Sequence, residues 1–294
     1  MDSRPALLLS VDFEDWHQLV RRRLGAENWS EPGPALKRQA EALLALLDEL
    51  EVKATFFILG MAARAHPDLV EAVVERGHEI GCHGDAHLPV HTQTPAEFAA
   101  DLKSARATIE SLTGREPVGY RAPAFSITRQ ASWAYQVLAE QGFAYDASQH
   151  DTPRIRDRAI PASSSPHPLA PAGNGPLWEF PAAVWSGRFG RLPVGGASYW
   201  TAMPTELVLR GLRRAGSYAG LYLHPHELDP QPLRVDLPPG ASVAQRARAG
   251  VRVGQRNSAR RRAAAVLRAI ADRFELIPYG DAHAKLSAGA GARP

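Results

Sequence analysis

The stretch that decides the fold is Ala6–Asp15, which reads ALLLSVDFED. Its first six residues, Ala6–Val11, form a mostly apolar run of the length of a buried β-strand. Asp12, Glu14 and Asp15 follow at once, so the strand ends in a cluster of carboxylates. Carboxylates this close repel one another unless a cation or an arginine neutralises them, which favours a functional cluster over a plain surface turn.

The same order of an apolar run followed by a helical pattern repeats along the chain. Further strands are predicted at Val52–Leu59, His78–Cys82, Val118–Arg121, Phe143–Asp146, Trp178–Pro181, Gly220–His224 and Phe274–Ile277. Helices are predicted at Ala35–Leu50, Pro67–Arg76, Thr94–Leu112, Arg129–Gln141, Pro204–Ala215 and Ser258–Arg273. Strands that alternate with helices indicate a mainly parallel sheet. We therefore expect an α/β fold, a distorted (β/α) barrel of about seven parallel strands.

Two proline-rich stretches, Thr152–Pro176 and Asp229–Val251, are predicted to be long loops. We expect residues 1–230 to form the barrel domain, including an insert at residues 152–200. Residues 231–294 are expected to form a C-terminal helical extension that packs on the barrel and ends in a frayed tail.

The composition is that of a globular protein, because 45% of the 294 residues are hydrophobic and 22% are charged. No apolar stretch approaches the ~18–20 residues of a membrane helix, and no secretory signal is visible, so we expect a cytoplasmic protein. The single cysteine, Cys82, excludes a disulfide scaffold and any zinc site built from several cysteines. We expect its side chain to lie in the core, on the opposite side of the strand from His83.

The net charge of +3 owes much to arginines late in the chain, in Arg246–Arg273. A surface for nucleic acid would interleave basic residues with aromatic ones, and this stretch has no aromatic residue before Phe274. We expect a solvated helix face and no nucleic-acid partner.

The predicted strands deliver ionisable groups to one edge, where the carboxyl ends of parallel strands meet. His83 and His87 follow one strand, Arg121 and Asp146 end two others, and His224 ends a later one. Two histidines and one carboxylate are a frequent catalytic zinc set that leaves a position open for water.

His224 is the candidate acid because the unperturbed pKa of histidine lies near neutrality. His226, two residues on, could share its face, and spacing alone does not decide between the two. The aromatic residues around the proline-rich segment fit either packing or a platform for stacking sugars. They are Trp178, Trp185, Tyr199 and Trp200.

Four ordered motifs carry a resemblance to a known family: SVDFED at 10–15, HGDAH at 83–87, RAPAF at 121–125 and LYLHPHE at 221–227. Together they resemble the polysaccharide deacetylases with a NodB homology domain, carbohydrate esterase family four. The stretches VDFEDWH, GYRAPAFS, YDAS, EFP, RLPVGGASY and YLHPHELDP resemble one branch more closely. That branch is the deacetylases of the exosortase A (XrtA, PEP-CTERM) exopolysaccharide system.

The resemblance implies a NodB-like barrel and a role for each motif residue. Asp12 would be the catalytic base and Arg121 would hold it, His83 and His87 would bind the metal, and His224 would be the general acid. The third ligand would be Glu14, because alternate residues of a strand face the same way, with Asp15 left open.

Asp146 would stand for the aspartate of the family's Asp-x-x-x-Trp motif. Gly84 replaces the family's Ser or Thr, and His226 stands where relatives often have Trp. The expected substrate-binding residues are Pro123, Phe125, Trp178, Tyr199, Leu223 and His226.

The implied activity is a metal-dependent hydrolase that removes N-acetyl groups from amino sugars of an exopolysaccharide or its precursor. A divalent ion, Zn²⁺ by preference, would polarise the acetamide carbonyl and activate water. The implied partners are an N-acetylated polysaccharide and the exopolysaccharide synthesis machinery. Association with that machinery would hold the protein near the membrane through other proteins. Two alternatives stay open: a cyclic-imide or allantoin-type amidohydrolase of the same fold, with or without a metal, and a non-catalytic glycan-binding protein.

Overall fold

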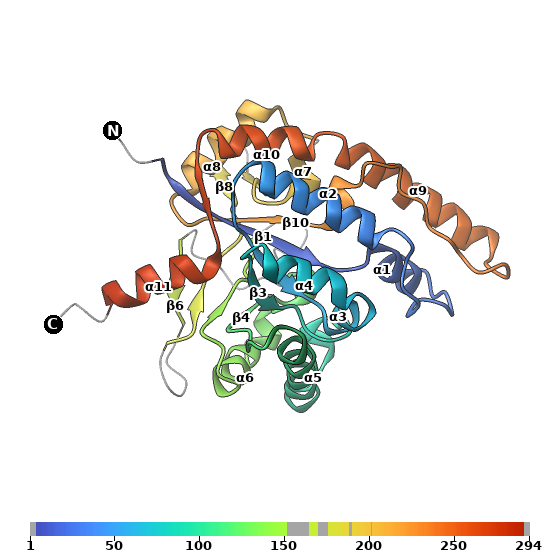
Figure 1. Cartoon of the computed structure of the whole chain (residues 1–294), viewed down its shortest axis with the longest axis horizontal. Coiled ribbons are helices and arrows are strands. Elements are labelled where there is room, and N and C mark those ends of the chain that lie inside the picture. Colours follow the sequence, from blue (N-terminus) through green and yellow to red (C-terminus); the bar gives the residue numbers. More distant parts are fainter. Residues whose placement is uncertain (1–3, 152–164, 170–175, 188–189, 201, 291–294) are drawn as a thin grey trace.

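The fold is centred on the first strand, β1 (Ala6–Phe13). The computed structural model describes residues 4–151, 165–169, 176–187, 190–200 and 202–290. On one side β1 pairs in parallel with β10 (Gly220–Leu223); on the other side it pairs in parallel with β11 (Glu275–Ile277) through residues 6–8 and with β2 (Thr55–Ile58) through residues 10–13. The strand is thus buried between neighbours from the two ends of the chain (Figure 1).

The sheet continues from β2 through four more parallel strands in the order β3, β4, β5 and β7. These are β3 (Glu79–Cys82), β4 (Gly119–Tyr120), β5 (Tyr145–Asp146) and β7 (Trp178–Glu179). Just after β7 the backbone reaches β10: the Gly220 N–H donates to Pro181 O at 3.0 Å, and the Ala183 N–H donates to Gly220 O at 2.8 Å. The seven strands β1–β5, β7 and β10 therefore close on themselves within the described chain, which confirms the distorted barrel.

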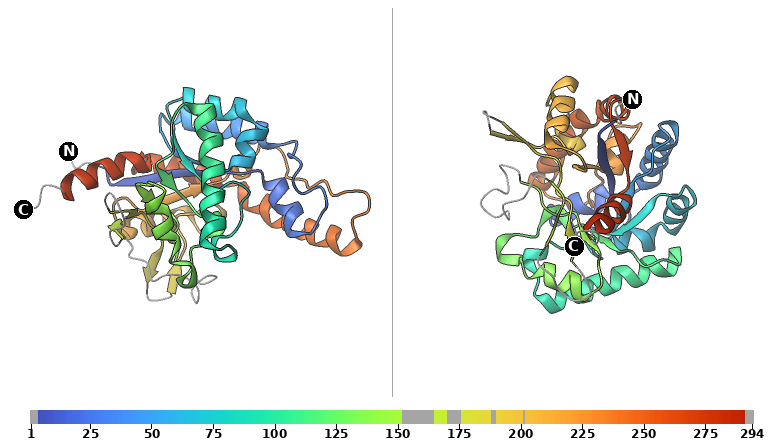
Figure 2. Two further views of the ribbon diagram at one scale, coloured as in Figure 1. Left: turned by 90° about the horizontal axis from the view of Figure 1, so that it is seen from below. Right: turned by 90° about the vertical axis from the view of Figure 1, so that its left-hand side faces the viewer.

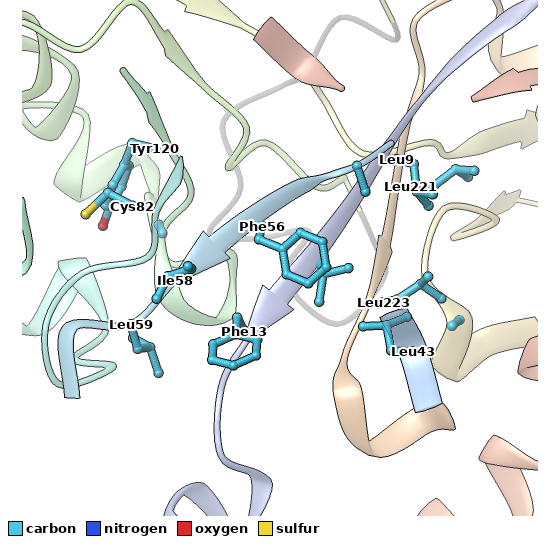
Figure 3. Packing of buried hydrophobic residues seen from close by; sticks show 14 of the residues in the cluster. Leu9, Phe13, Leu43, Phe56, Ile58, Leu59, Cys82, Tyr120, Leu221 and Leu223 are labelled. Carbon is cyan, nitrogen blue, oxygen red and sulfur yellow. The ribbon is translucent and has the colours of Figure 1, made fainter. Parts of the chain in front are cut away.

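Helices cover the outside of the barrel (Figures 1 and 2). They are α2 (Leu36–Glu49), α3 (Gly60–Ala65), α4 (Pro67–Glu75), α5 (Pro95–Thr113), α6 (Ala134–Glu140), α8 (Thr205–Ala215) and α10 (Ala263–Ala271). Alternate residues of a strand point to opposite faces. Leu9 and Phe13 accordingly join the core under the helices (Figure 3). Leu8, Ser10 and Asp12 point to the other face, into the barrel.

Capping residues mark the helix ends that the sequence predicts best. Thr94 and Glu97 form the capping box of α5, and the helix ends at Gly114, whose φ of 66° a side chain would disfavour. Two predicted helices are interrupted. The one at 129–141 is a 3₁₀ turn, Arg129–Ala131, followed by α6. The one at 258–273 divides into the end of α9 (Val243–Arg260) and α10.

The start of α9 corrects the loop expected at 229–251. Ser242 and Gln245 form a capping box there, a signal that the prolines just before it outweighed in the sequence. Four more helices were not expected: α1 (Trp16–Arg23), directly after β1, the short helices α3 and α7 (Ala197–Trp200), and α11 (Tyr279–Ala290). The last four residues of the predicted tail lie outside the described residues.

The segment after residue 230 is part of the barrel's own packing. Its strand β11 pairs with β1, and Val266, Leu267 and Ile270 of α10 belong to the main core. These contacts are packing of the extension on the barrel; the division at residue 230 stays a prediction. Much of the loop expected at 152–176 lies outside the described residues; within it β6 (His167–Pro168) pairs antiparallel with β7.

The remaining elements lie around the barrel mouth. They are the hairpin β8 (Trp185–Gly187) and β9 (Gly190–Leu192), helix α7 (Ala197–Trp200), and 3₁₀ turns at Val90–Thr92, Pro123–Phe125 and Pro225–Leu228. Among the described residues, no helix combines the length and apolar character needed to cross a membrane.

Candidate active site

A buried arginine holds the first carboxylate of the site. Arg121 follows β4, points into the barrel and has no exposed surface. Its guanidinium donates to Asp12 Oδ1 at 2.8 Å, to Ser10 Oγ at 2.6 Å and to the Tyr279 hydroxyl at 2.8 Å. Burial alone would lower the pKa of Arg121, but the Asp12 carboxylate outweighs it and raises that pKa. Asp12 is therefore fixed through one oxygen, and its Oδ2 faces His224 Nε2 at 3.8 Å.

Glu14, His83 and His87 converge beside Asp12. Glu14 Oε2 lies 3.0 Å from His87 Nε2 and 3.8 Å from His83 Nε2, and one ligand atom of each residue lies within 4.8 Å of the others. Burial would raise the pKa of Glu14, but His87 and His83 outweigh it and hold the pKa well below its ordinary value. An ionised carboxylate and two imidazoles suit Zn²⁺ or a similar divalent ion.

The backbone aims both histidines at that point. His83 Nδ1 lies 2.8 Å from Arg121 O, which leaves its Nε2 for a metal, an arrangement that metal-binding histidines commonly adopt. His87 has a φ of 53°, which is unusual for a residue with a side chain. Gly84 has a φ of 80°, and a Cβ there would meet Asp101 Oδ2 at 2.7 Å. A glycine in place of the family's Ser or Thr is thus what this loop requires.

His224 stands on the far side of the same carboxylates. Its Nε2 lies 3.7 Å from Glu14 Oε1, while its Nδ1 lies 3.2 Å from Glu227 Oε2. The Glu227 carboxylate also accepts from the His224 N–H at 2.9 Å, so the ring is held from behind. Burial would lower the pKa of His224, but Glu227, Glu14 and Asp12 outweigh it and raise that pKa to about 9.

Asp15 points away from this cluster and caps the N-terminus of helix α1 instead. Its two carboxylate oxygens accept from the His17 N–H at 2.8 Å and from the Gly33 N–H at 2.5 Å, and it is the N-cap of α1. Of the two ligands left open, the structure brings Glu14 to the histidines.

Asp146 also lies away from the cluster, on the other face of the sheet. Its neighbours Tyr145 and Ala147 pack inside the barrel, so the intervening Asp146 faces outward, opposite Glu179 of β7. Its Oδ1 accepts from Ser148 Oγ at 2.6 Å, and Ser148 Oγ accepts from the Ala122 N–H at 2.8 Å. Asp146 therefore supports the loop behind Arg121, and no contact joins it to Asp12 or His224 among the described residues.

The structure divides the six expected substrate-binding residues into two groups. Phe125 and Tyr199 are half-buried at the barrel mouth, and Pro123 lies in the loop that carries Phe125. The other three are buried in packing roles. Leu223 packs near Leu43 under α2 (Figure 3). Trp178 belongs to the cluster inside the barrel, and His226 stacks on Trp16.

Sequence reasoning missed four residues that shape the site. Glu227 stands within the quoted LYLHPHE motif, yet nothing in the motif shows that its carboxylate turns back to His224. Ser10 and Tyr279 contact Arg121 from opposite ends of the chain, which no local pattern can show.

The fourth residue is His150. The centroids of its ring and of the Phe125 ring lie 4.6 Å apart, and burial together with Arg121 lowers the pKa of His150 to about 3. It stands four residues after Asp146, the spacing of the family's Trp. Cys82 is in the core, as expected.

Taken together, an inward carboxylate held by arginine, a Glu-His-His cluster and a histidine that faces both are groups that could hold a divalent ion and transfer protons. The comparisons with known proteins point to deacetylases. Residues 31–145 match the family model described as polysaccharide deacetylase, and residues 151–274 match one described as a domain of unknown function (DUF3473). The first match contains His83, His87 and Arg121, and the second contains His224, so the site draws on both.

Two curated relatives are each similar over about a third of the chain. A peptidoglycan deacetylase-like protein of Gibberella zeae is 35% identical over 108 residues, which are 36% of this chain and 31% of the relative. The peptidoglycan deacetylase of Helicobacter pylori is 33% identical over 107 residues, 36% of this chain and 35% of that protein. The chain therefore matches about a third of the length of each of these relatives.

Solved structures extend the similarity of the fold to almost the whole chain. A putative polysaccharide deacetylase from Mycobacterium smegmatis aligns with a TM-score of 0.66 at 19% identity, over 98% of this chain and 92% of that one. The Puue allantoinase aligns with a TM-score of 0.53 at 19% identity, over 86% of this chain and 85% of that one. At such identities the alignments show a shared fold, and it is the NodB-like barrel that the motifs predict.

Proposed function

We propose that this protein is a metal-dependent N-deacetylase that removes acetyl groups from amino sugars of a polysaccharide, an exopolysaccharide or its precursor. The observation that carries the proposal is the convergence of Glu14, His83 and His87 beside Asp12 and His224. The family match of residues 31–145 and the deacetylase relatives support the same activity. The branch-level resemblance to exopolysaccharide deacetylases supports the choice of polymer and stays a prediction.

In this mechanism Glu14, His83 and His87 would hold the metal ion. When bound, the ion supplies Lewis acidity that polarises an acetamide carbonyl and lowers the pKa of water to about 7. Asp12 takes up a proton at Oδ2, because Arg121 holds Oδ1 and fixes the carboxylate in place. His224 donates a proton from Nε2 to the leaving amine, because Glu227 holds its Nδ1. Acetate and a free amino sugar result.

The first test is the metal content of the purified protein. We expect about one equivalent of zinc or a similar ion by elemental analysis, and its loss in the His83→Ala/His87→Ala variant. A matched control is His167→Ala/His283→Ala, which removes two imidazoles away from the site and should retain the ion. No ion in the wild-type protein after reconstitution with Zn²⁺ would contradict the proposal and favour the metal-free amidohydrolase or the glycan-binding protein.

Activity is tested in parallel by acetate release from chitin oligosaccharides. We expect release that EDTA abolishes and Zn²⁺ restores, and none from the His83→Ala/His87→Ala variant. Turnover of a cyclic imide without release of acetate from any glycan would show that the same fold carries the other amidohydrolase activity.

A further inference from the structure

Two helices that the proposed mechanism does not use form one unit beside the barrel mouth. Helix α9 projects from the body of the molecule and lies against α1, on the side toward which β1 points (Figures 1 and 2). Trp16, Val20 and Leu24 of α1 share a small core with Ala249 of α9, and Gln245 Nε2 donates to Leu24 O at 2.9 Å. We call the exposed side of these two helices the α1–α9 surface.

The two helices concentrate positive charge. They contain eight arginines and no acidic residue, namely Arg21, Arg22, Arg23, Arg246, Arg248, Arg252, Arg256 and Arg260. The whole chain has 34 basic and 31 acidic residues. Without these eight arginines the balance becomes 26 against 31, a net charge of −5. The mild excess over the whole chain therefore hides a strongly basic region on an acidic remainder.

None of the eight arginines forms an ion pair with a carboxylate in the part of the chain that the structure describes. Arginines on other helices do so, for example Arg38 with Asp229 and Arg64 with Asp85. Five of the eight bond to carbonyl, hydroxyl or amide oxygens, which leave the charge uncompensated; Arg260, for example, donates to Asp229 O and to Asn257 Oδ1. A cluster of unpaired guanidinium groups is costly unless an anion binds there.

Three of these arginines line one hollow between the helices. Arg23 lies on the α1 side and Arg248 and Arg252 on the α9 side, with Leu24 and Val251 between them. Burial lowers the pKa of Arg23, the Glu14 carboxylate acts against it, and the nearby Arg252 and Arg256 lower the pKa as well, so the net shift is downward and several positive charges lie close together.

The hollow lies near the catalytic groups through short connections on both helices. Helix α1 begins at Trp16, two residues after Glu14, and its eight residues span only about 12 Å. On α9, Arg256 donates to Ser198 Oγ, which donates to the Glu227 carboxylate that holds His224. A polymer bound at the barrel mouth can therefore reach the hollow with a neighbouring sugar.

We propose that the hollow lined by Arg23, Arg248 and Arg252 is a binding subsite for an acidic sugar of the polysaccharide, one that carries a carboxylate. The proposal rests on the proposed function and narrows its substrate to a polymer with N-acetylated and acidic sugars. A planar guanidinium can bind a carboxylate through two parallel hydrogen bonds, which gives orientation as well as affinity. The apolar atoms of Leu24 and Val251 suit the ring of the sugar.

The test compares acidic and neutral glycans as probes in direct binding measurements on the full chain. We expect calorimetry to show that hyaluronan or polygalacturonate oligosaccharides bind more tightly than the neutral chitin hexasaccharide, and more weakly as salt rises. The Arg248→Gln/Arg252→Gln variant should bind the acidic probes about tenfold more weakly and the neutral probe within about twofold of wild type. The control Arg213→Gln/Arg214→Gln removes two exposed charges from α8 and should change neither.

Several outcomes would overturn the subsite. They are the absence of binding to both acidic probes, equal losses in the two double variants, or an Arg248/Arg252-dependent binding of phosphatidylglycerol vesicles with glycan binding unchanged. The last outcome would make the surface a membrane contact.

Acetate release separates this inference from the proposed function. Arginine-dependent binding of acidic glycans without acetate release from any glycan retains the subsite and rejects the deacetylase. Acetate release from chitin hexasaccharide without any arginine-dependent preference does the reverse.

Discussion

Two buried carboxylate pairs lie on opposite faces of the same sheet, and their surroundings differ. Asp12 and Glu14 face the barrel interior, where Arg121 and three histidines surround them. Asp146 and Glu179 face outward and have no cation in hydrogen-bond contact among the described residues. Burial, and then the neighbouring Asp146, raise the pKa of Glu179 well above its ordinary value, and burial raises that of Asp146 as well.

The difference shows what makes a buried carboxylate useful for chemistry. The imidazoles around Glu14 hold its pKa well below the ordinary value despite burial, which suits a metal ligand. Glu179 has no such partners in hydrogen-bond contact, its pKa is raised, and it holds the backbone, because its Oε1 accepts from the Gln149 N–H at 2.9 Å. Burial at a strand end is therefore no evidence of catalysis until the charges around it are known.

The largest expected effect is on turnover, when Asp12 of the inward carboxylate pair is replaced. Asp12→Asn should lower turnover by about 10²–10⁴-fold and leave the metal content unchanged, because it removes the proton acceptor but no ligand. Asp146→Asn should change turnover far less. Steady-state acetate release and elemental analysis on both variants measure this, and wild-type turnover in Asp12→Asn would remove that residue from the mechanism.

A smaller effect, on the free energy of unfolding, is expected when Arg121 is replaced. Arg121→Met should lower the free energy of unfolding by about 3–5 kcal/mol, because it leaves the Asp12 carboxylate buried and uncompensated. The control is Arg64→Met, which breaks the exposed pair with Asp85 and should cost no more than about 1 kcal/mol. Urea denaturation measures both, and equal losses would show that Arg121 is no more than a surface-type partner.

The smallest effect is on the pH dependence of stability, when Glu179 of the outward carboxylate pair is replaced. A carboxyl group whose pKa is raised in the folded state stabilises below the unfolded pKa and loses that contribution as pH rises toward the folded value. Glu179 therefore should cost the wild-type protein up to about 1.4 kcal/mol per pH unit above its unfolded pKa of about 4.3. Glu179→Gln should flatten that decline, and parallel stability curves from pH 5 to 8 for both proteins would contradict it.

Local sequence patterns predict most of the fold and the centre of the site. The alternation of apolar runs and helical patterns indicated the parallel barrel, and the capping box at Thr94 and the glycine at 114 marked both ends of α5. The approach of Glu14 to His83 and His87 was expected as well, because a strand has a period of two and places Asp12 and Glu14 on one face; that these three residues bind a metal stays a prediction. The same period, counted in β5, turns Asp146 outward, which could have been inferred once the register of that strand was known.

The chain by itself determined the residues that can do the chemistry: the carboxylates after β1, the His83/His87 pair, Arg121 and His224 each follow a strand that its own apolar pattern reveals. Only the tertiary structure decided which groups surround them. Tyr279 reaches Arg121 across 158 residues, Glu227 turns back on His224, and α9 brings its arginines beside those of α1. These contacts arise when the barrel closes and distant segments pack, and no local periodicity records them.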